Sequence, residues 1–152
     1  MAEYPILTEL LNLSNVQVVH YQLVGTERIN LFVESTLPTG VCPECGQIST
    51  EIHDKAEPQM IRDLSIWDRR CLLRVTLRRF KCATCKNTFV ERLVWRDPGR
   101  DYTIRYEQHI YYRSRGEPIS QVAQDERLSE DIVQGIFECW AKKQSQSEAT
   151  RS

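Results

Sequence analysis

The 152-residue sequence predicts an α+β protein in which a small β-rich domain is followed by a helical domain. Two Cys-x-x-Cys motifs, separated by 36 residues, indicate that the first domain is organised around two tight turns. Residues 71–80 alternate apolar and mostly basic side chains, which is typical of a strand with one buried face. Residues 103–140 carry apolar side chains at helical spacing, so the second domain is predicted to be helical.

The N-terminal segment is predicted to form a helix and a β-hairpin. Residues 4–13 carry leucine and isoleucine side chains at a spacing that places them on one side of a helix. Residues 16–23 and 28–36 are rich in β-branched and aromatic side chains, and the short gap between them contains Gly25. This pattern indicates two strands joined by a turn.

The strongest chemical signal is the pair of cysteine motifs, formed by Cys42 with Cys45 and by Cys82 with Cys85. Two cysteines three positions apart can lie on one tight turn and direct both sulfurs to one metal ion. Two such turns complete a tetrahedral four-sulfur site, which is typical of zinc. Gly46 suits the sharp turn that must follow the second sulfur. The sequence therefore predicts zinc as a structural cofactor.

Other interpretations of the cysteines are weaker. A single Cys-x-x-Cys could be a thioredoxin-like redox pair, but two in one short chain favour zinc. His53 lies near the first motif and is a minor candidate to replace one sulfur ligand. Cys71 and Cys139 are predicted to be buried free thiols.

The spacer between the motifs exceeds the roughly 15–20 residues of common zinc ribbons, so it must contain its own secondary structure. Residues 48–53 are predicted to form a short strand and residues 54–60 a loop. Residues 71–80 form the clearest strand, with leucine and valine on one face and Arg70, Arg74 and Arg78 on the other. A closing strand is predicted at 88–91, which completes the order of a zinc ribbon.

The net charge of −1 hides a strong asymmetry. Residues 62–115 hold 14 Lys/Arg and 6 Asp/Glu, a net charge of +8, whereas residues 1–61 carry −6 and residues 116–152 carry −3. A basic middle indicates a surface that faces a polyanion, although a solvated face with internal ion pairs is the alternative. Guanidinium groups match phosphate oxygens in pairs. The candidate DNA-contacting residues are Arg69, Arg70, Arg74, Arg78, Arg79, Lys81 and Lys86.

The domain boundary is predicted within the polar segment 92–101, which contains Pro98 and Gly99. The predicted domains are a zinc ribbon with its N-terminal helix and hairpin, a helix-turn-helix-like domain and a disordered polar tail, at 1–96, 97–142 and 143–152. Thr103 is a predicted N-cap for the first helix of the second domain.

Two further helices are predicted after Pro118 and after Ser129, which suit a helix start and an N-cap. The spacing of Ala123, Leu128 and Val133 is that of a helix-turn-helix. The second helix of this motif would normally enter the major groove. Here it carries acidic Glu130, Asp131 and Glu138, which phosphates repel, so a protein-docking role is the alternative.

Taken together, these segments resemble the N-terminal region of the ISL-three family of insertion-sequence transposases. The resemblance rests on the first cysteine motif with Gly46 and on Arg-Arg-Phe-Lys-Cys and Thr-Phe-Val-Glu around the second. It covers roughly residues 5–140 and implies a zinc ribbon followed by a helix-turn-helix that recognises the terminal repeats of the element. The family continues into a DDE-type nuclease domain, which we expect this chain to lack.

We expect a zinc-dependent DNA-binding protein of bacterial, cytoplasmic origin that binds transposon ends or a promoter and is not an enzyme. No apolar run reaches the length of a membrane span, and no Ser-His-Asp set or phosphate loop has a convincing context, so no membrane or small-molecule partner is expected. The alternative is an interaction adaptor whose acidic helices bind a protein partner or a second copy. The oligomeric state is left open.

Overall fold

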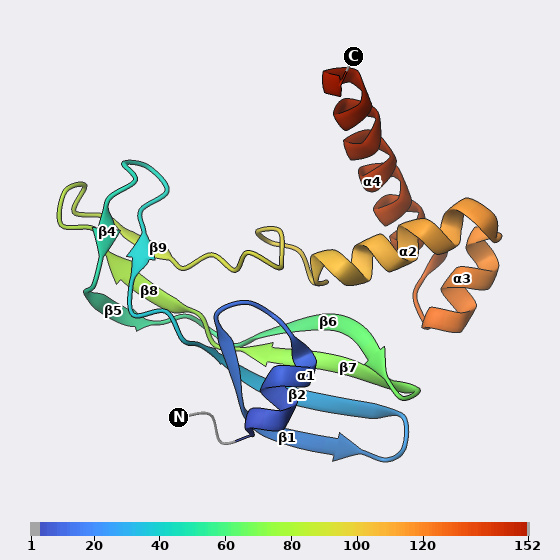
Figure 1. Cartoon of the computed structure of the whole chain (residues 1–152), viewed down its shortest axis with the longest axis horizontal. Coiled ribbons are helices and arrows are strands. Elements are labelled where there is room, and N and C mark those ends of the chain that lie inside the picture. Colours follow the sequence, from blue (N-terminus) through green and yellow to red (C-terminus); the bar gives the residue numbers. More distant parts are fainter. Residues whose placement is uncertain (1–3, 152) are drawn as a thin grey trace. The chain divides into compact units, whose positions relative to one another are not determined.

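The computed structural model describes residues 4–151 and divides into two compact units between Thr103 and Ile104 (Figure 1). This confirms the α+β class, with strands confined to the first unit and three of the four helices in the second. The observed division lies seven residues beyond the predicted boundary at 96/97, and its cause is found in the strands of the first unit.

The first unit is built on a four-stranded sheet in the order β1-β2-β7-β6. Its strands are β1 (Val16–Val24), β2 (Arg28–Ser35), β6 (Gln59–Ile66) and β7 (Arg69–Val75). The predicted β1–β2 hairpin is confirmed, and β2 pairs in parallel with β7. One face of the sheet packs against α1 (Pro5–Leu11) and against Leu93 and Trp95. Figure 1 shows α1 beside β1 and β2.

The zinc-ribbon part of this unit contains two smaller sheets, β3-β4 and β5-β8-β9. Its strands are β3 (Gly40–Val41), β4 (Ile48–Ser49), β5 (Ile52–Lys55), β8 (Arg78–Lys81) and β9 (Thr88–Val90). The closing strand predicted after the second cysteine motif is therefore confirmed as β9.

Two sequence predictions for the spacer are wrong. The segment 71–80 is not one strand, because β7 ends at Val75 and β8 begins in another sheet at Arg78. Between them Leu77 is buried in the core and its carbonyl accepts a hydrogen bond from the Ala56 amide, at 2.8 Å. The predicted loop 54–60 also overlaps β5 and the start of β6, because both segments find strand partners far along the chain.

The residues before the second unit are attached to β6 rather than free. The amide of Arg62 donates to the Asp101 carbonyl, and the Thr103 amide donates to the Arg62 carbonyl, both at 2.9 Å. The Thr103 hydroxyl donates to the Asp63 carboxylate at 2.8 Å. These bonds explain why the first unit extends to Thr103.

The second unit contains α2 (Ile104–Gly116), α3 (Ile119–Glu126) and α4 (Glu130–Arg151), which pack pairwise on one another. Ser129 caps α4 as predicted, since its hydroxyl accepts a hydrogen bond from the Ile132 amide at 3.2 Å. The predicted disordered tail from residue 143 is instead the last part of α4. Residues 141–149 hold Ala, Lys, Gln, Ser and Glu without glycine or proline, which is compatible with a helix. No described helix is both long and apolar enough to cross a membrane.

Candidate metal centre and helix-turn-helix

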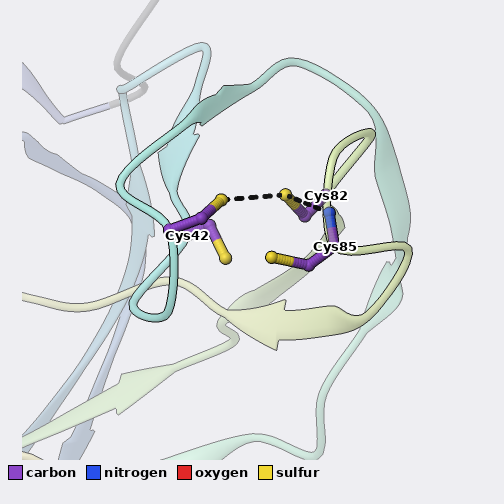
Figure 2. Close-up of side chains that lie close together, drawn as sticks. Cys42, Cys82 and Cys85 are labelled. Carbon is purple, nitrogen blue, oxygen red and sulfur yellow. Dashed lines mark hydrogen bonds between the residues drawn. The ribbon is translucent and has the colours of Figure 1, made fainter.

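The four cysteines of the two motifs converge on one point in the first unit. Their Sγ atoms all lie within 4.8 Å of one another, and those of Cys45 and Cys82 are 3.5 Å apart. Figure 2 shows the labelled sulfurs of Cys42, Cys82 and Cys85 directed from two separate loops into the same space. Zinc–sulfur bonds of about 2.3 Å place the corners of a tetrahedron about 3.8 Å apart, so the cluster fits a zinc ion. His53 is exposed and does not belong to this group.

The two loops that carry the cysteines have the same backbone structure. In the first, the Gly46 amide donates to the Cys42 carbonyl, and in the second the Lys86 amide donates to the Cys82 carbonyl, each at 2.9 Å. Gly46 and Lys86 both have positive φ, at 74° and 64°. The left-handed turn that glycine adopts freely is thus adopted by lysine in the second loop, at some conformational cost.

The thiols of this cluster differ in how readily they ionise. The backbone N–H of Cys85, 3.4 Å from the Cys82 sulfur, lowers the pKa of the Cys82 thiol to about 7. A hydrogen bond with Cys45, together with burial, raises the pKa of the Cys85 thiol to about 12. One thiol therefore ionises readily and another resists, and repulsion by the Cys45 sulfur adds to the effect of the hydrogen bond and of burial on Cys85. A divalent metal ion compensates this repulsion and binds the thiolate form.

Little apolar packing supports the metal-binding loops. The described core beneath them consists of Phe80 and Phe89 with the cysteines, and the two rings stack with centroids 5.9 Å apart. Gly40 must be glycine for this packing, since a Cβ there would lie 2.7 Å from the Phe80 ring. A core this small indicates that the metal supplies much of the stability of the ribbon.

The seven predicted DNA-contacting residues lie in strands of two different sheets and in one metal-binding loop. Arg78 and Arg79 lie in β8 and are bound to carboxylates, Arg78 to Glu91 at 2.9 Å and Arg79 to Asp54 at 2.6 Å. Burial disfavours ionisation of Glu91, but the hydrogen bonds from Arg78 outweigh it and hold the pKa of this carboxyl below its ordinary value. The structure thus gives Arg78 a role within the fold, as in the alternative of internal ion pairs that the sequence analysis kept for the basic segment.

The other predicted contacts are placed differently. Arg69, Arg70 and Arg74 belong to β7 in the four-stranded sheet, where Arg74 is exposed and lies 5.5 Å from the centroid of the Phe32 ring. Lys81 is half-buried in β8, and Lys86 is exposed in the second metal-binding loop. Contacts of these residues with DNA stay a prediction.

Sequence reasoning also missed two residues beside this group, Arg28 and Trp67. Arg28 pairs with Arg70 across the parallel strands β2 and β7, and no sequence pattern near either residue predicts this pairing. Trp67 lies in the two-residue turn between β6 and β7, and the sequence analysis predicted no strand over most of β6, beyond the predicted loop 54–60. Trp67-Asp68 is not one of the dipeptides that indicate a two-residue hairpin turn, so the local sequence did not indicate this turn.

The second unit has the geometry of a helix-turn-helix. The amide of Leu128 donates to the Ala123 carbonyl at 2.9 Å, and Arg127 between the helices has a φ of +55° where glycine is common. Ala123 is buried and small, which allows α3 and α4 to cross closely, and Val133 is fully buried on α4. The predicted motif is therefore present.

Ion pairs fasten α2 to α3. The Arg113 guanidinium binds Glu117 at 2.8 Å, Asp125 at 2.7 Å and Glu126 at 3.2 Å. These hydrogen bonds, chiefly that with Glu117, raise the pKa of Arg113 and lower the pKa of the Glu117 carboxyl. The acidic residues of α3 are therefore neutralised within the unit.

The acidic residues at the start of α4 have a different setting. Glu130 and Asp131 are exposed in its first turn, where they favour the positive end of the helix dipole. Glu138 accepts a hydrogen bond from Gln134 at 2.9 Å. The exposed face of α4 thus offers carboxylate and amide groups over its first three turns.

Both parts of the chain are similar to known transposase sequences. Residues 38–85 match a family described as the zinc-finger of transposase IS204/IS1001/IS1096/IS1165. Residues 91–141 match one described as the helix-turn-helix domain of transposase family ISL3. The four clustered cysteines, at the position of the zinc-finger match, therefore constitute a zinc site.

The transposase for insertion sequence element IS1001 of Bordetella parapertussis is 30% identical to the chain over 80 residues. These residues are 53% of the chain and 20% of the relative, so the chain spans about a fifth of the length of this curated relative. No solved structure matches the chain.

Proposed function

The chain carries a zinc ribbon and a helix-turn-helix domain of the ISL3 transposase family, and we propose that it binds DNA. The observation that carries this proposal is the α3–turn–α4 geometry, with Ala123 and Arg127 at its crossing and turn, inside the segment matched to a transposase helix-turn-helix. The DNA would be the ends of a transposable element or a promoter. Zinc would hold the ribbon, and the neighbouring four-stranded sheet would present the basic residues Arg70 and Arg74.

The salt dependence of binding tests this proposal. If Arg70 and Arg74 contact phosphates, the logarithm of the binding constant should fall by about 0.9 per contact for each tenfold rise in salt concentration. Replacing both arginines by glutamine should weaken binding to all duplex sequences alike and reduce the slope by about 2. Fluorescence anisotropy at several salt concentrations measures both quantities.

Arg79→Gln is the matched control, because the Arg79 guanidinium is already bound to Asp54. It removes one positive charge, half of what the double variant removes, and should leave the slope nearly unchanged. A reduction of the slope by about 1 for Arg79→Gln would contradict the assignment of phosphate contacts to β7. A loss confined to one DNA sequence would contradict it too, since phosphate contacts do not read bases.

We further propose that this chain binds DNA without cutting or joining strands. Several of its buried or half-buried carboxylates already have partners within the fold, which leaves them unsuited to holding catalytic metal ions. These pairs are Glu91 with Arg78, Asp63 with Thr103, Glu107 with Trp140, and Glu126 with Tyr106. The zinc-loaded protein should neither nick nor join supercoiled plasmid in magnesium or manganese. Nicking that co-purifies with the protein and needs the divalent ion would overturn this proposal.

A second candidate function is an adaptor that binds a protein or a second copy through its acidic helix. The exposed Glu130 and Asp131 at the start of α4 favour it, since they would face phosphates unfavourably in a major groove. In that case DNA binding should be absent at low salt. Glu130→Gln together with Asp131→Asn would weaken self-association measured by sedimentation instead of strengthening DNA binding.

A further inference from the structure

An exposed tryptophan lies at the tip of the β6–β7 hairpin. This residue is Trp67, which is 86% exposed. Together with Asp68 it forms the two-residue turn of the hairpin. Both residues have positive φ, at 43° and 67°. Turns of this kind favour Asn-Gly, and a bulky residue at positive φ is strained. Neither packing nor turn geometry therefore accounts for tryptophan at this position.

Four arginines extend from this tip along the sheet, namely Arg28, Arg69, Arg70 and Arg74. Because β2 and β7 are parallel, Arg28 pairs with Arg70 at the end of the sheet where the β6–β7 turn lies. Figure 1 shows the β1–β2 and β6–β7 turns at this same end. Arg74 follows Arg70 by four positions, so both side chains point to the same face of β7. That face is opposite to the one that packs on α1, on which strand alternation places Arg69 with the buried Cys71 and Leu73.

These guanidinium groups differ from the other arginines discussed above. Within residues 4–151, none of the four has an ion pair or a side-chain hydrogen bond to a carboxylate. The guanidinium of Arg74 has a cation–π contact with the Phe32 ring. The Nε atoms of Arg28 and Arg69 are shielded from solvent and have no hydrogen-bond partner. Arg78, Arg79 and Arg113 are all bound to carboxylates. Unpaired cations on one sheet end complement a polyanion.

We propose that this end of the sheet, the Trp67 tip, is a nucleic-acid contact in which Arg28, Arg70 and Arg74 bind phosphates and the Trp67 indole stacks on an unpaired base. The proposal rests on the DNA-binding function proposed above and adds a preference among DNA structures. An indole at a narrow hairpin tip reaches the flat face of a base only where that base is unpaired or unstacked. Stacking of this kind tolerates any base sequence.

The expected preference is for DNA with accessible bases over closed duplex. The closed duplex is one whose two ends are capped by short loops with stacked bases. It offers phosphates to the arginines, but few of its base faces are accessible to Trp67. A single-stranded stretch, or a duplex with a single-stranded flap, offers both. The zinc-loaded full chain should bind the flapped duplex more tightly than the closed one, by about tenfold if one base stacks.

Tryptophan fluorescence reports the contact directly. The chain has three tryptophans, of which Trp95 is 8% exposed and Trp140 is half-buried with its Nε1 bonded to Glu107. Trp67 is therefore the ring most open to quenching by a stacked base. Titration with an oligo(dT) flap should quench emission, and Trp67→Asn should abolish that quenching and the tenfold preference. Trp67→Phe keeps a ring and should retain most of the preference.

Trp67→Asn also separates binding from folding. Asparagine tolerates positive φ, so this variant should melt at the same temperature or higher. Equal flap preference in wild type and Trp67→Asn, with closed-duplex binding intact, would overturn this inference and leave the proposed function standing. Failure of the wild type to bind either DNA would overturn both. Quenching by an acidic peptide in place of DNA would identify a protein partner for the tip and overturn the inference.

Discussion

Chelation of zinc should unfold the ribbon strands β3, β4, β5, β8 and β9 while the helices of the second unit stay folded. A structural zinc ion contributes on the order of 10–16 kcal/mol to folding. That exceeds or matches the roughly 5–15 kcal/mol net stability of a typical domain. The ribbon has few other sources of stability, since its described core is Phe80 and Phe89 with the cysteines. The four-stranded sheet has its own larger core and should retain protection near Leu31 and Leu73.

Hydrogen exchange measured by mass spectrometry, with zinc content determined in parallel, distinguishes these regions. Cys82→Ser should bind no stoichiometric zinc and should exchange rapidly throughout residues 78–90. Cys139→Ser is the control, because Cys139 lies in α4 outside the cysteine cluster, and it should keep both zinc and protection. A Cys82→Ser protein with one bound zinc and native exchange in β8 would refute the four-cysteine assignment.

The metal site was predictable because its information is local. Each Cys-x-x-Cys specifies its own tight turn, and the repeated hydrogen bonds around Gly46 and Lys86 show that both turns form in the same way. The helix-turn-helix was predictable for the same reason, since Ala123, Leu128 and Ser129 act within a few residues of one another. Features that depend on a few neighbouring residues, such as these turns and helix caps, can be predicted from one sequence without knowledge of the fold.

The four-stranded sheet was not predictable to the same degree, because its central pairing joins strands about forty residues apart. Nothing near Arg28 indicates that it faces Arg70 across a parallel ladder. The alternation through 71–80 gave the correct buried side chains, including Leu73 and Val75. The alternation could not show that the chain leaves this sheet after Val75. Arg74 in β7 and Arg78 in β8 are four positions apart, as they would be on one face of a continuous strand.

The arginine row also illustrates what charge patterning cannot resolve. Sequence spacing treats Arg74 and Arg78 as equivalent members of one basic face. In the structure Arg74 is exposed and Arg78 is bound to Glu91, a residue 13 positions away whose side chain is only 5% exposed. Whether an arginine is free depends on where the carboxylates lie after folding, and that is decided by tertiary contacts.

Arg78→Ala should destabilise the first unit by about 3 kcal/mol, because it leaves the Glu91 carboxylate buried without its counter-charge. The Arg78 guanidinium donates to both Glu91 oxygens, at 2.9 and 3.0 Å, and also to the Ser35 hydroxyl at 3.0 Å and the Leu37 carbonyl. It thereby fastens β8 to the end of β2. Chemical denaturation followed by circular dichroism measures the free energy of unfolding.

The pH dependence of this loss identifies its cause. In the wild type the pKa of Glu91 lies below its ordinary value of 4.5, so the pair stabilises the fold above that value and its contribution is lost as pH falls through the folded pKa. In Arg78→Ala the guanidinium no longer lowers the pKa of Glu91, while burial still raises it and the backbone amide at position 78 and Ser35 still lower it, so this pKa should lie above its wild-type value. The difference between the two proteins should therefore shrink as pH falls from 7 toward about 4.

Two further variants separate this pair from general effects of charge and from zinc loss in acid. Arg79→Ala removes the exposed pair with Asp54 and should cost no more than about 1 kcal/mol, with little change in its pH profile. Adding Glu91→Gln to Arg78→Ala removes the buried charge and should restore part of the lost stability. Loss of stability in Arg78→Ala that is constant with pH, and that Glu91→Gln does not relieve, would show that packing of the Arg78 side chain rather than its charge matters.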